Sequence, residues 1–143
     1  MRGMTHLGAG LATAAMMPSL TAPALVGIAL GSLLPDADSP KSIIGRHIPV
    51  IPRLIRHRTL THTIWFAALF MFLYPPLGIG IITHIVLDLC NPDGVPILWP
   101  IKWKLRIPII NRFCKSGRMA DNLLGTVCWV VAIAGFVQQM NII

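Results

Sequence analysis

Histidine and aspartate are the residue types in this sequence whose spacing could support chemistry. His84 and Asp88 are four residues apart, so a helix would place both side chains on one face. Imidazole and carboxylate groups are suitable ligands for zinc, manganese or iron. The other candidate residues are His6, Asp36, Asp38, His57 and His62. Because catalytic zinc needs about three protein ligands and an open position, these residues suffice for one ion with supporting groups, or for two ions.

Each candidate has a simpler interpretation when it is taken alone. The His84 and Asp88 side chains could form a hydrogen bond on a helix surface. Residues 36–40 read as a turn, since Asp and Pro are common turn residues. His6 could be a histidine at a membrane interface. The metal-site hypothesis therefore depends on the convergence of all seven residues, and that convergence depends on the elements that carry them.

Other candidate sites have weaker support. The sequence contains no G-x-S-x-G elbow and no phosphate-binding P-loop. Its three cysteines form no Cys-x-x-Cys pair, and we interpret them as free thiols. Arg58 is a candidate substrate-binding residue for an anion, with anchoring to a lipid headgroup as the alternative. We interpret His47 and Asp93 as structural.

The composition is that of a membrane protein. The 143 residues are 55% hydrophobic and 12% charged, with a mean hydropathy of +0.71. Soluble domains carry about 25% charged residues. The net charge of +7 favours anionic partners such as lipid headgroups or nucleic acid. The chain contains no glutamate, so aspartate or histidine must perform any general-base chemistry.

Three long stretches carry almost no charge: residues 5–34, 59–87 and 122–140. The third has the length of about 20 residues that a transmembrane helix needs, and Asp121 is its predicted N-cap. The first two stretches contain prolines near their middle, which break helices. Each is therefore predicted to form a hairpin of two helices of roughly 13–16 residues, shorter than a full membrane span.

The basic residues test this arrangement. All twelve Lys and Arg residues fall at Arg2, in residues 41–58 or in residues 102–118. With two hairpins and a final helix, these three regions lie on one side of the membrane. The positive-inside rule makes that side cytoplasmic. The same arrangement brings all seven candidate residues to the cytoplasmic ends of the hairpins.

The sequence thus predicts an all-α integral membrane protein with a single domain spanning residues 1–143. Residues 101–107 alternate between basic and apolar side chains, which predicts a short strand within an interfacial loop. The predicted parts are a hairpin at 5–34, a basic interfacial loop at 41–58, a hairpin at 59–90, a second basic interfacial loop at 95–118, and a transmembrane helix at 122–140.

Five motifs in series resemble the YdjM family, which is described as LexA-binding, inner-membrane-associated, metal-dependent hydrolases. The resemblance runs in order from His6 to Pro100, about two thirds of the chain, and Asn91 departs from it where the family is expected to have threonine. The motifs are Thr5-His6, residues 31–40 (GSLLPDADSP), residues 57–62 (HRTLTH), His84-x-x-x-Asp88 and residues 94–100 (GVPILWP).

The resemblance implies metal-dependent hydrolysis at an inner membrane and supports the seven candidates as its site. We expect one or two divalent ions, with zinc as first choice and manganese or iron as alternatives. Asp38 is expected to orient a ligand or act as a general base, and His57 to act as a general acid or further ligand. The expected ligands are His6, Asp36, His62, His84 and Asp88, where Asp36 is a ligand or a bridge.

The expected function is a membrane-embedded hydrolase at the cytoplasmic face of a multi-pass inner-membrane protein, with a phosphoester lipid as substrate. The expected partners are membrane lipids, an anionic lipid substrate and a protein. One alternative is a non-catalytic metal-binding membrane protein, such as an ion transporter. Another is a membrane-anchored module whose basic loops bind an acidic protein or nucleic acid. That module would not need the histidines, so nucleic acid is not an expected partner.

Overall fold

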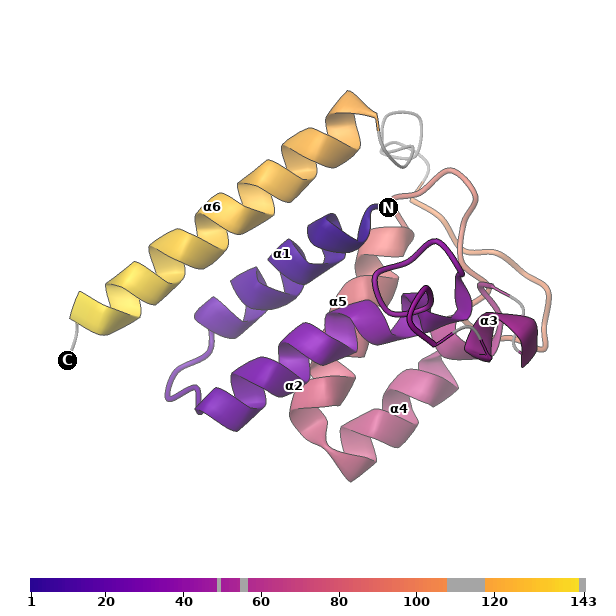
Figure 1. Cartoon of the computed structure of the whole chain (residues 1–143), viewed down its shortest axis with the longest axis horizontal. Helices are drawn as coiled ribbons and strands as arrows, with labels where there is room; N and C mark the ends of the chain where they lie inside the picture. The colour runs from indigo at the N-terminus through magenta and orange to yellow at the C-terminus, as the bar shows by residue number, and fades with distance from the viewer. Residues whose placement is uncertain (49, 55–56, 108–117, 142–143) are drawn as a thin grey trace.

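Helices form the regular structure of this chain (Figure 1). The computed structural model describes residues 1–48, 50–54, 57–107 and 118–141, and the all-α prediction is confirmed for them. The α-helices are α1 (Gly3–Ala15), α2 (Ala22–Leu33), α3 (Ile51–Leu54), α4 (Ile64–Leu73), α5 (Pro75–Asp88) and α6 (Met119–Asn141). Two 3-10 helices, η1 (Leu34–Asp38) and η2 (Leu60–His62), follow α2 and precede α4.

Both long apolar stretches are broken at their prolines, as the sequence predicts. The Thr21 hydroxyl accepts a hydrogen bond from the backbone N–H of Ala24 and caps α2, whose first turn contains Pro23. Tyr74 has extended backbone and precedes Pro75 at the start of α5. At 12 and 10 residues, α2 and α4 are shorter than the predicted 13–16. The start of α4 is late because Thr63 caps it.

Two glycines allow α2 and α5 to approach closely. A methyl group on Gly31 would collide with the backbone carbonyl oxygen of Leu77, and one on Gly80 would collide with that of Ile28. The helices therefore meet backbone to backbone, without intervening side chains. This contact places the end of α2 beside the last turns of α5, which carry His84 and Asp88.

Helix α1 lies between α2 and α6 (Figure 1). At the far end of this contact, the Gln139 amide donates hydrogen bonds to the carbonyl oxygens of Ala15, the last residue of α1, and of Met17, two residues further on. At the near end, the Asp121 carboxylate accepts hydrogen bonds from Thr5 and from the backbone of Arg2. The prediction that Asp121 caps α6 is wrong: the helix begins two residues earlier, and the carboxylate bonds to α1 instead.

Helix α6 is the one element in the described part of the chain that is long and apolar enough to cross a membrane. Its span of 22 residues, Met119–Met140, has a mean hydropathy of 1.7, and 11% of the apolar window is buried. The apolar helices α4 and α5 are shorter. Large apolar side chains also remain exposed on α4, including Trp65 at 60% and Phe72 at 87%.

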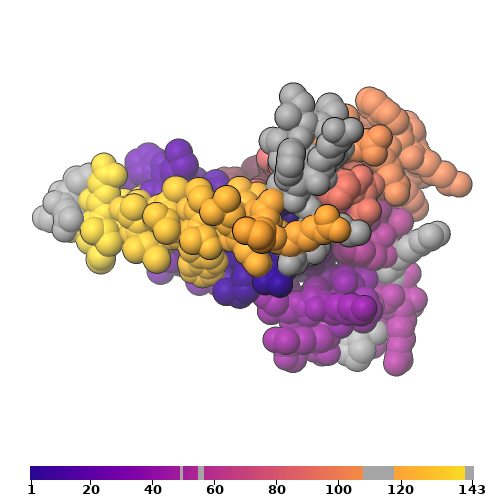
Figure 2. Space-filling model, turned by 90° about the horizontal axis from the view of Figure 1, so that it is seen from above, coloured from indigo at the N-terminus to yellow at the C-terminus, as the bar shows by residue number. Residues whose placement is uncertain are grey.

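The segments that follow α2 and α5 lie at the end of the molecule near the N-terminus and form its wide end (Figures 1 and 2). The strand predicted for residues 101–107 is wrong: in the described ranges we find a single antiparallel bridge between Val95 and Leu105. Pro96 and Pro100 lack an N–H group, and a turn separates the two segments beyond this pair. The predicted basic loops include residues 49, 55–56 and 108–117, which lie outside the described residues.

Candidate metal centre

Four elements deliver the candidate ligands to the same end of the molecule. His6 comes from the start of α1, and His62 is the last residue of η2. Asp36 lies in η1, the 3-10 helix that directly follows α2. The helix α2 ends here because Pro35 disfavours an α-helical conformation in the residue before it. His84 and Asp88 share one face at the end of α5. The three histidines and Asp88 are buried, while Asp36 is 15% exposed.

Four buried imidazole nitrogens in this cluster have no hydrogen-bond partner among the described residues. They are both ring nitrogens of His6 and the Nε2 atoms of His62 and His84. Leaving a buried polar atom unpaired costs about 1–3 kcal/mol. The three Nε2 atoms face the same two carboxylates, and a cation bound between them would compensate this cost.

The protonation state of His84 follows from its backbone contact. Its Nδ1 lies 2.7 Å from the carbonyl oxygen of Ser32. A carbonyl oxygen only accepts, so Nδ1 carries the proton and Nε2 presents a lone pair. The His6 and His84 rings are stacked at 3.7 Å between centroids and 15° between planes, an arrangement that disfavours two charged rings. Neutral imidazole is the form that binds metals.

Two linked hydrogen bonds determine which ring nitrogen of His62 carries a proton. The Thr61 hydroxyl donates its one hydrogen to Asp38 Oδ2 at 2.6 Å. His62 Nδ1 lies 3.0 Å from the same hydroxyl oxygen, which can then only accept. Nδ1 therefore carries a proton, and in the neutral tautomer of His62 the lone pair lies on Nε2 and faces the cluster. Partners of this kind orient metal-binding histidines in proteins.

The distances between candidate ligand atoms suit a metal ion. His84 Nε2 lies 3.7 Å from Asp36 Oδ1, and His6 Nε2 lies 3.4 Å from Asp88 Oδ1. His62 Nε2 lies 3.7 Å from Asp88 Oδ2. These distances exceed those of hydrogen bonds. Ligands about 2.0–2.2 Å from zinc are roughly 3.0–3.5 Å apart, so the pair at 3.4 Å lies within this range and the two pairs at 3.7 Å lie just above it.

Three overlapping sets of residues bring their ligand atoms within 4.8 Å of one another. These buried histidine and aspartate groups could bind a metal ion, and the donor set fits zinc, manganese or iron. The sets are His6, Asp36 and His84; Asp36, His57 and His62; and His62, His84 and Asp88.

Asp38 and His57 form a hydrogen-bonded pair at the edge of the cluster. His57 Nδ1 donates to Asp38 Oδ1 at 2.6 Å. This bond raises the pKa of His57 above its ordinary value, against the opposing effect of partial burial. Burial would raise the pKa of the Asp38 carboxyl, but contacts with His57, His62 and Thr61 outweigh it and hold that pKa well below its usual range. His57 remains 41% exposed.

Arg58 is held over the cluster in an unusual conformation. Its φ of 61° lies in the left-handed region that L-residues other than glycine rarely adopt. The Asp38 carboxylate accepts a hydrogen bond from its backbone N–H at 3.0 Å, which supports this turn. The guanidinium lies 3.3 Å from Asp88 Oδ2 and donates to Asp93 Oδ2 at 3.0 Å. The interpretation of Asp93 as structural therefore omitted a contact with the site.

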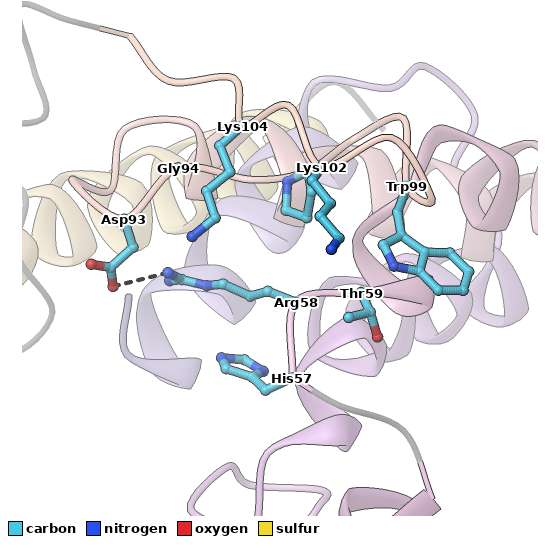
Figure 3. Close-up of a pocket in the computed structure, with 9 residues that line it drawn as sticks. His57, Arg58, Thr59, Asp93, Gly94, Trp99, Lys102 and Lys104 are labelled. Carbon is cyan, nitrogen blue, oxygen red and sulfur yellow. Dashed lines mark hydrogen bonds and ion pairs between the residues drawn. The ribbon is translucent and has the colours of Figure 1, made fainter.

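Two open cavities adjoin the cluster and share His57 and Arg58. One has a volume of about 460 Å³, and its lining includes Lys102, Lys104 and Trp99. Figure 3 shows the two lysine side chains pointing toward Arg58 from the opposite side of this cavity. The other, of about 410 Å³, is lined by Asp36 and further basic residues. Both cavities are thus positively charged beside the candidate ligands.

The sequence-predicted residues all come together at this end. His62 lies in η2, since α4 begins only at Ile64. Thr61 was not among the candidate residues, although it joins Asp38 to His62. A hydroxyl residue directly before a candidate ligand was the signal that could have identified it.

The sequence is similar to those of known inner membrane proteins. The model of the family described as YdjM inner membrane protein matches residues 1–142. Inner membrane protein YdjM of Escherichia coli (strain K12) is 38% identical over 100 residues, which cover 57% of this chain and 51% of that protein; its namesake from Shigella flexneri gives the same values. The chain therefore spans about half the length of these two relatives.

A further relative aligns along most of both chains. Protein YvsG of Bacillus subtilis (strain 168) is 31% identical over 142 residues, which cover 87% of each protein. No solved structure matches the chain.

Proposed function

The chain belongs to the YdjM family of inner membrane proteins, and from this premise we propose that it is a membrane-embedded, metal-dependent hydrolase. The observation that carries the proposal is the set of three buried Nε2 atoms without hydrogen-bond partners. For two of them, His62 and His84, the partner of Nδ1 fixes the lone pair on the cluster side. Unpaired lone pairs next to two carboxylates form a site for a cation.

The proposed ligands of one or two divalent ions are His6, Asp36, His62, His84 and Asp88. Zinc is the first choice, with manganese or iron as alternatives. A bound divalent ion would supply the Lewis acidity that activates water and neutralises charge on an ester. Asp36 belongs to two of the three ligand sets and is the more exposed carboxylate, so it is the candidate bridge between two ions.

His57 has the geometry of a general acid. Its Nδ1 is occupied by Asp38, while its ring lines both cavities and is partly exposed. In the proposed reaction, an oxygen of water bonds to phosphorus, the ester P–O bond breaks, and His57 Nε2 gives its proton to the leaving oxygen. The water releases one proton to solvent, and solvent returns a proton to His57. Asp38 orients the ring and is a weak base because its pKa is depressed, which favours the orienting role over the general-base role.

The proposed substrate is a phosphoester of a membrane lipid, bound at the cytoplasmic face. Arg58, Lys102 and Lys104 line the cavity beside the site together with Asp93, whose carboxylate pairs with Arg58, and the remaining net positive charge would attract a phosphate. The family is one of inner membrane proteins, so an enzyme of this kind meets lipid headgroups directly. Membrane lipids and a further protein are the proposed partners.

The proposed topology is multi-pass, with α1–α2 and α4–α5 as two short hairpins and α6 as a full span. Helices of 10–14 residues are about 15–21 Å long, which is less than a ~30 Å hydrocarbon core. The hairpins would therefore tilt, or thin the bilayer locally. Labelling of cysteines placed one at a time at Lys41, Lys102 and Gln138, in a variant without native cysteines, tests this. Lys41 and Lys102 on different sides would contradict the topology.

Activity is tested by incubating the metal-loaded protein with mixed phospholipids and lipid phosphates. The Asp38→Asn and His57→Ala variants serve as controls for contaminating hydrolases. We expect released phosphate or phosphorylated headgroups with the wild-type protein and little with either variant. Equal products from all three proteins would contradict the proposal. If the wild-type protein hydrolyses only soluble esters or amides, and the two variants do not, the protein is a hydrolase but its substrate is not a lipid.

A further inference from the structure

An apolar groove lies between α4 and α5. Nine side chains line it, all of them apolar, and its volume is about 340 Å³. Ile64, Ile82 and Val86 on its walls are 42–50% exposed, so the groove opens to the outside of the helix pair. Its size falls in the range of roughly 300–1,000 Å³ that is usual for small-molecule sites.

Two short segments separate this groove from the basic cavity of Arg58, Lys102 and Lys104. In the first segment, Pro96 and Trp99 line the basic cavity and Ile97 lines the groove. In the second, Thr59 lines the cavity and Ile64 lines the groove. The backbone N–H of Ile64 donates to the carbonyl oxygen of Ile97 at 2.9 Å, which joins the two segments. The apolar groove and the basic cavity therefore lie on the two sides of these joined segments, with no lining residue in common.

A ligand that fills both spaces must have an anionic group at one end and an apolar chain at the other. A lipid phosphate has this form. The basic end attracts its headgroup electrostatically, and the apolar end gains free energy in proportion to the chain surface removed from water. A soluble phosphoester would use only the basic cavity, and a neutral lipid only the groove.

We propose that the α4–α5 groove binds the acyl chain of a lipid phosphate whose headgroup lies in the basic cavity next to His57. The proposal rests on the proposed function and specifies its substrate: the chain is part of what the site recognises. It also assigns a binding role to α4, which contributes no candidate metal ligand.

Ala68 provides a variant that tests the groove. Its side chain lines the groove and is exposed, so Ala68→Trp would fill the space without disturbing the packed face of α4. The neighbouring Leu69 is 52% exposed and does not line the groove. Leu69→Trp is therefore the matched control for adding a tryptophan to the outer surface of the same helix.

The experiment measures the binding of a long-chain alkyl phosphonate, which cannot be hydrolysed and which carries a nitroxide near the end of its chain. The protein is metal-loaded and reconstituted in nanodiscs, and the immobilised fraction of the nitroxide spectrum is recorded. A lipid with the same labelled chain and an uncharged headgroup serves as the ligand control. We expect immobilisation of the phosphonate by wild type and by Leu69→Trp, with binding about tenfold weaker in Ala68→Trp, since losing the burial of two methylenes has about that effect.

Equal immobilisation of the neutral lipid would show ordinary contact with surrounding lipid and would overturn the groove proposal. Equal phosphonate binding by the two tryptophan variants would overturn it as well. Groove-dependent binding without cleavage of any phosphoester would support the groove and reject the hydrolase. Cleavage of soluble phosphoesters at equal rates by wild type and Ala68→Trp, with no immobilised phosphonate, would support the hydrolase and reject the groove.

Discussion

Asp88 and Asp121 are both buried carboxylates near the start of α1, but their neighbours differ in kind. Asp121 accepts hydrogen bonds from the Thr5 hydroxyl at 2.9 Å and from the Arg2 backbone at 3.2 Å. Asp88 faces the amino group of Met1, the Arg58 guanidinium, and imidazole nitrogens of His6 and His62 that have no hydrogen-bond partner.

The difference distinguishes a structural carboxylate from a proposed ligand. Around Asp121, the Thr5 hydroxyl and the Arg2 backbone are neutral donors, and these hydrogen bonds hold α6 to α1. Around Asp88, the neighbours are two cations, the Met1 amino group and the Arg58 guanidinium, and two imidazole Nε2 atoms without hydrogen-bond partners. A site that combines carboxylates with unprotonated imidazoles has an excess of electron pairs, which a bound cation would balance.

Removing two of the proposed ligands should have the largest effect. In the His84→Ala and Asp88→Ala double variant, we expect the purified protein to lose most of its one or two equivalents of transition metal, because two donors are removed from one face of α5. Elemental analysis of the purified protein measures this. The matched comparison is Asp121→Asn, which should keep its metal. Full metal content in the double variant would contradict the ligand assignment.

Removing His57 should affect turnover more than metal content. Loss of a general acid reduces the rate by roughly 10²–10⁴-fold, so His57→Ala should have a much lower kcat with its metal retained. Phosphate release and elemental analysis on the same preparation measure both quantities. Loss of metal together with activity would instead identify His57 as a metal ligand. This outcome is compatible with the structure, because the ligand atoms of His57, Asp36 and His62 lie close together.

Removing the Thr61 hydroxyl should have a smaller effect that only the proposed centre explains. Thr61→Val keeps the shape of the side chain but leaves His62 without the acceptor that fixes its protonated nitrogen. Groups in this role typically contribute 10–100-fold to metal affinity, so a loss in this range is expected in a chelator competition assay. Thr5→Val removes a hydroxyl from the Asp121 side and should leave metal affinity unchanged. Equal effects of both variants would contradict the distinction between the two regions.

The sequence predicted the parts of this arrangement that follow from local rules. Prolines break apolar stretches wherever they occur, so the divisions before Ala22 and Pro75 were predictable. The four-residue spacing of His84 and Asp88 places both on one face of any helix. The clustering of the other candidates followed from charge distribution, which identifies the ends of segments even when their exact limits are unknown.

The remaining features depend on tertiary contacts. The sequence suggested Asp121 as a cap because it precedes an apolar run, but α1 offers it the Thr5 hydroxyl and the Arg2 amide. The alternation of residues 101–107 resembles a strand, yet Leu105 forms the single bridge found among the described residues, and the backbone N–H of Ile107 donates to the carbonyl oxygen of Leu89 instead. The role of Thr61 depends on which neighbour takes its single hydrogen. No pattern in the sequence encodes that choice.

Replacing Asp121 should have the smallest effect, and it should fall on stability alone. In Asp121→Asn, the amide keeps the size of the side chain but has only one oxygen, so it cannot accept from both Thr5 and Arg2 as the carboxylate does. An unpaired buried donor costs about 1–3 kcal/mol. The variant should therefore have a lower Tm in detergent, because the contact between α1 and α6 is weakened.

Since His6 lies one residue from Thr5, a structural change large enough to move α1 would also disturb the cluster. The expected result is a lower Tm with unchanged metal content and an unchanged increase of Tm on metal addition. Loss of the metal-dependent increase would show that the two carboxylates belong to one coupled site.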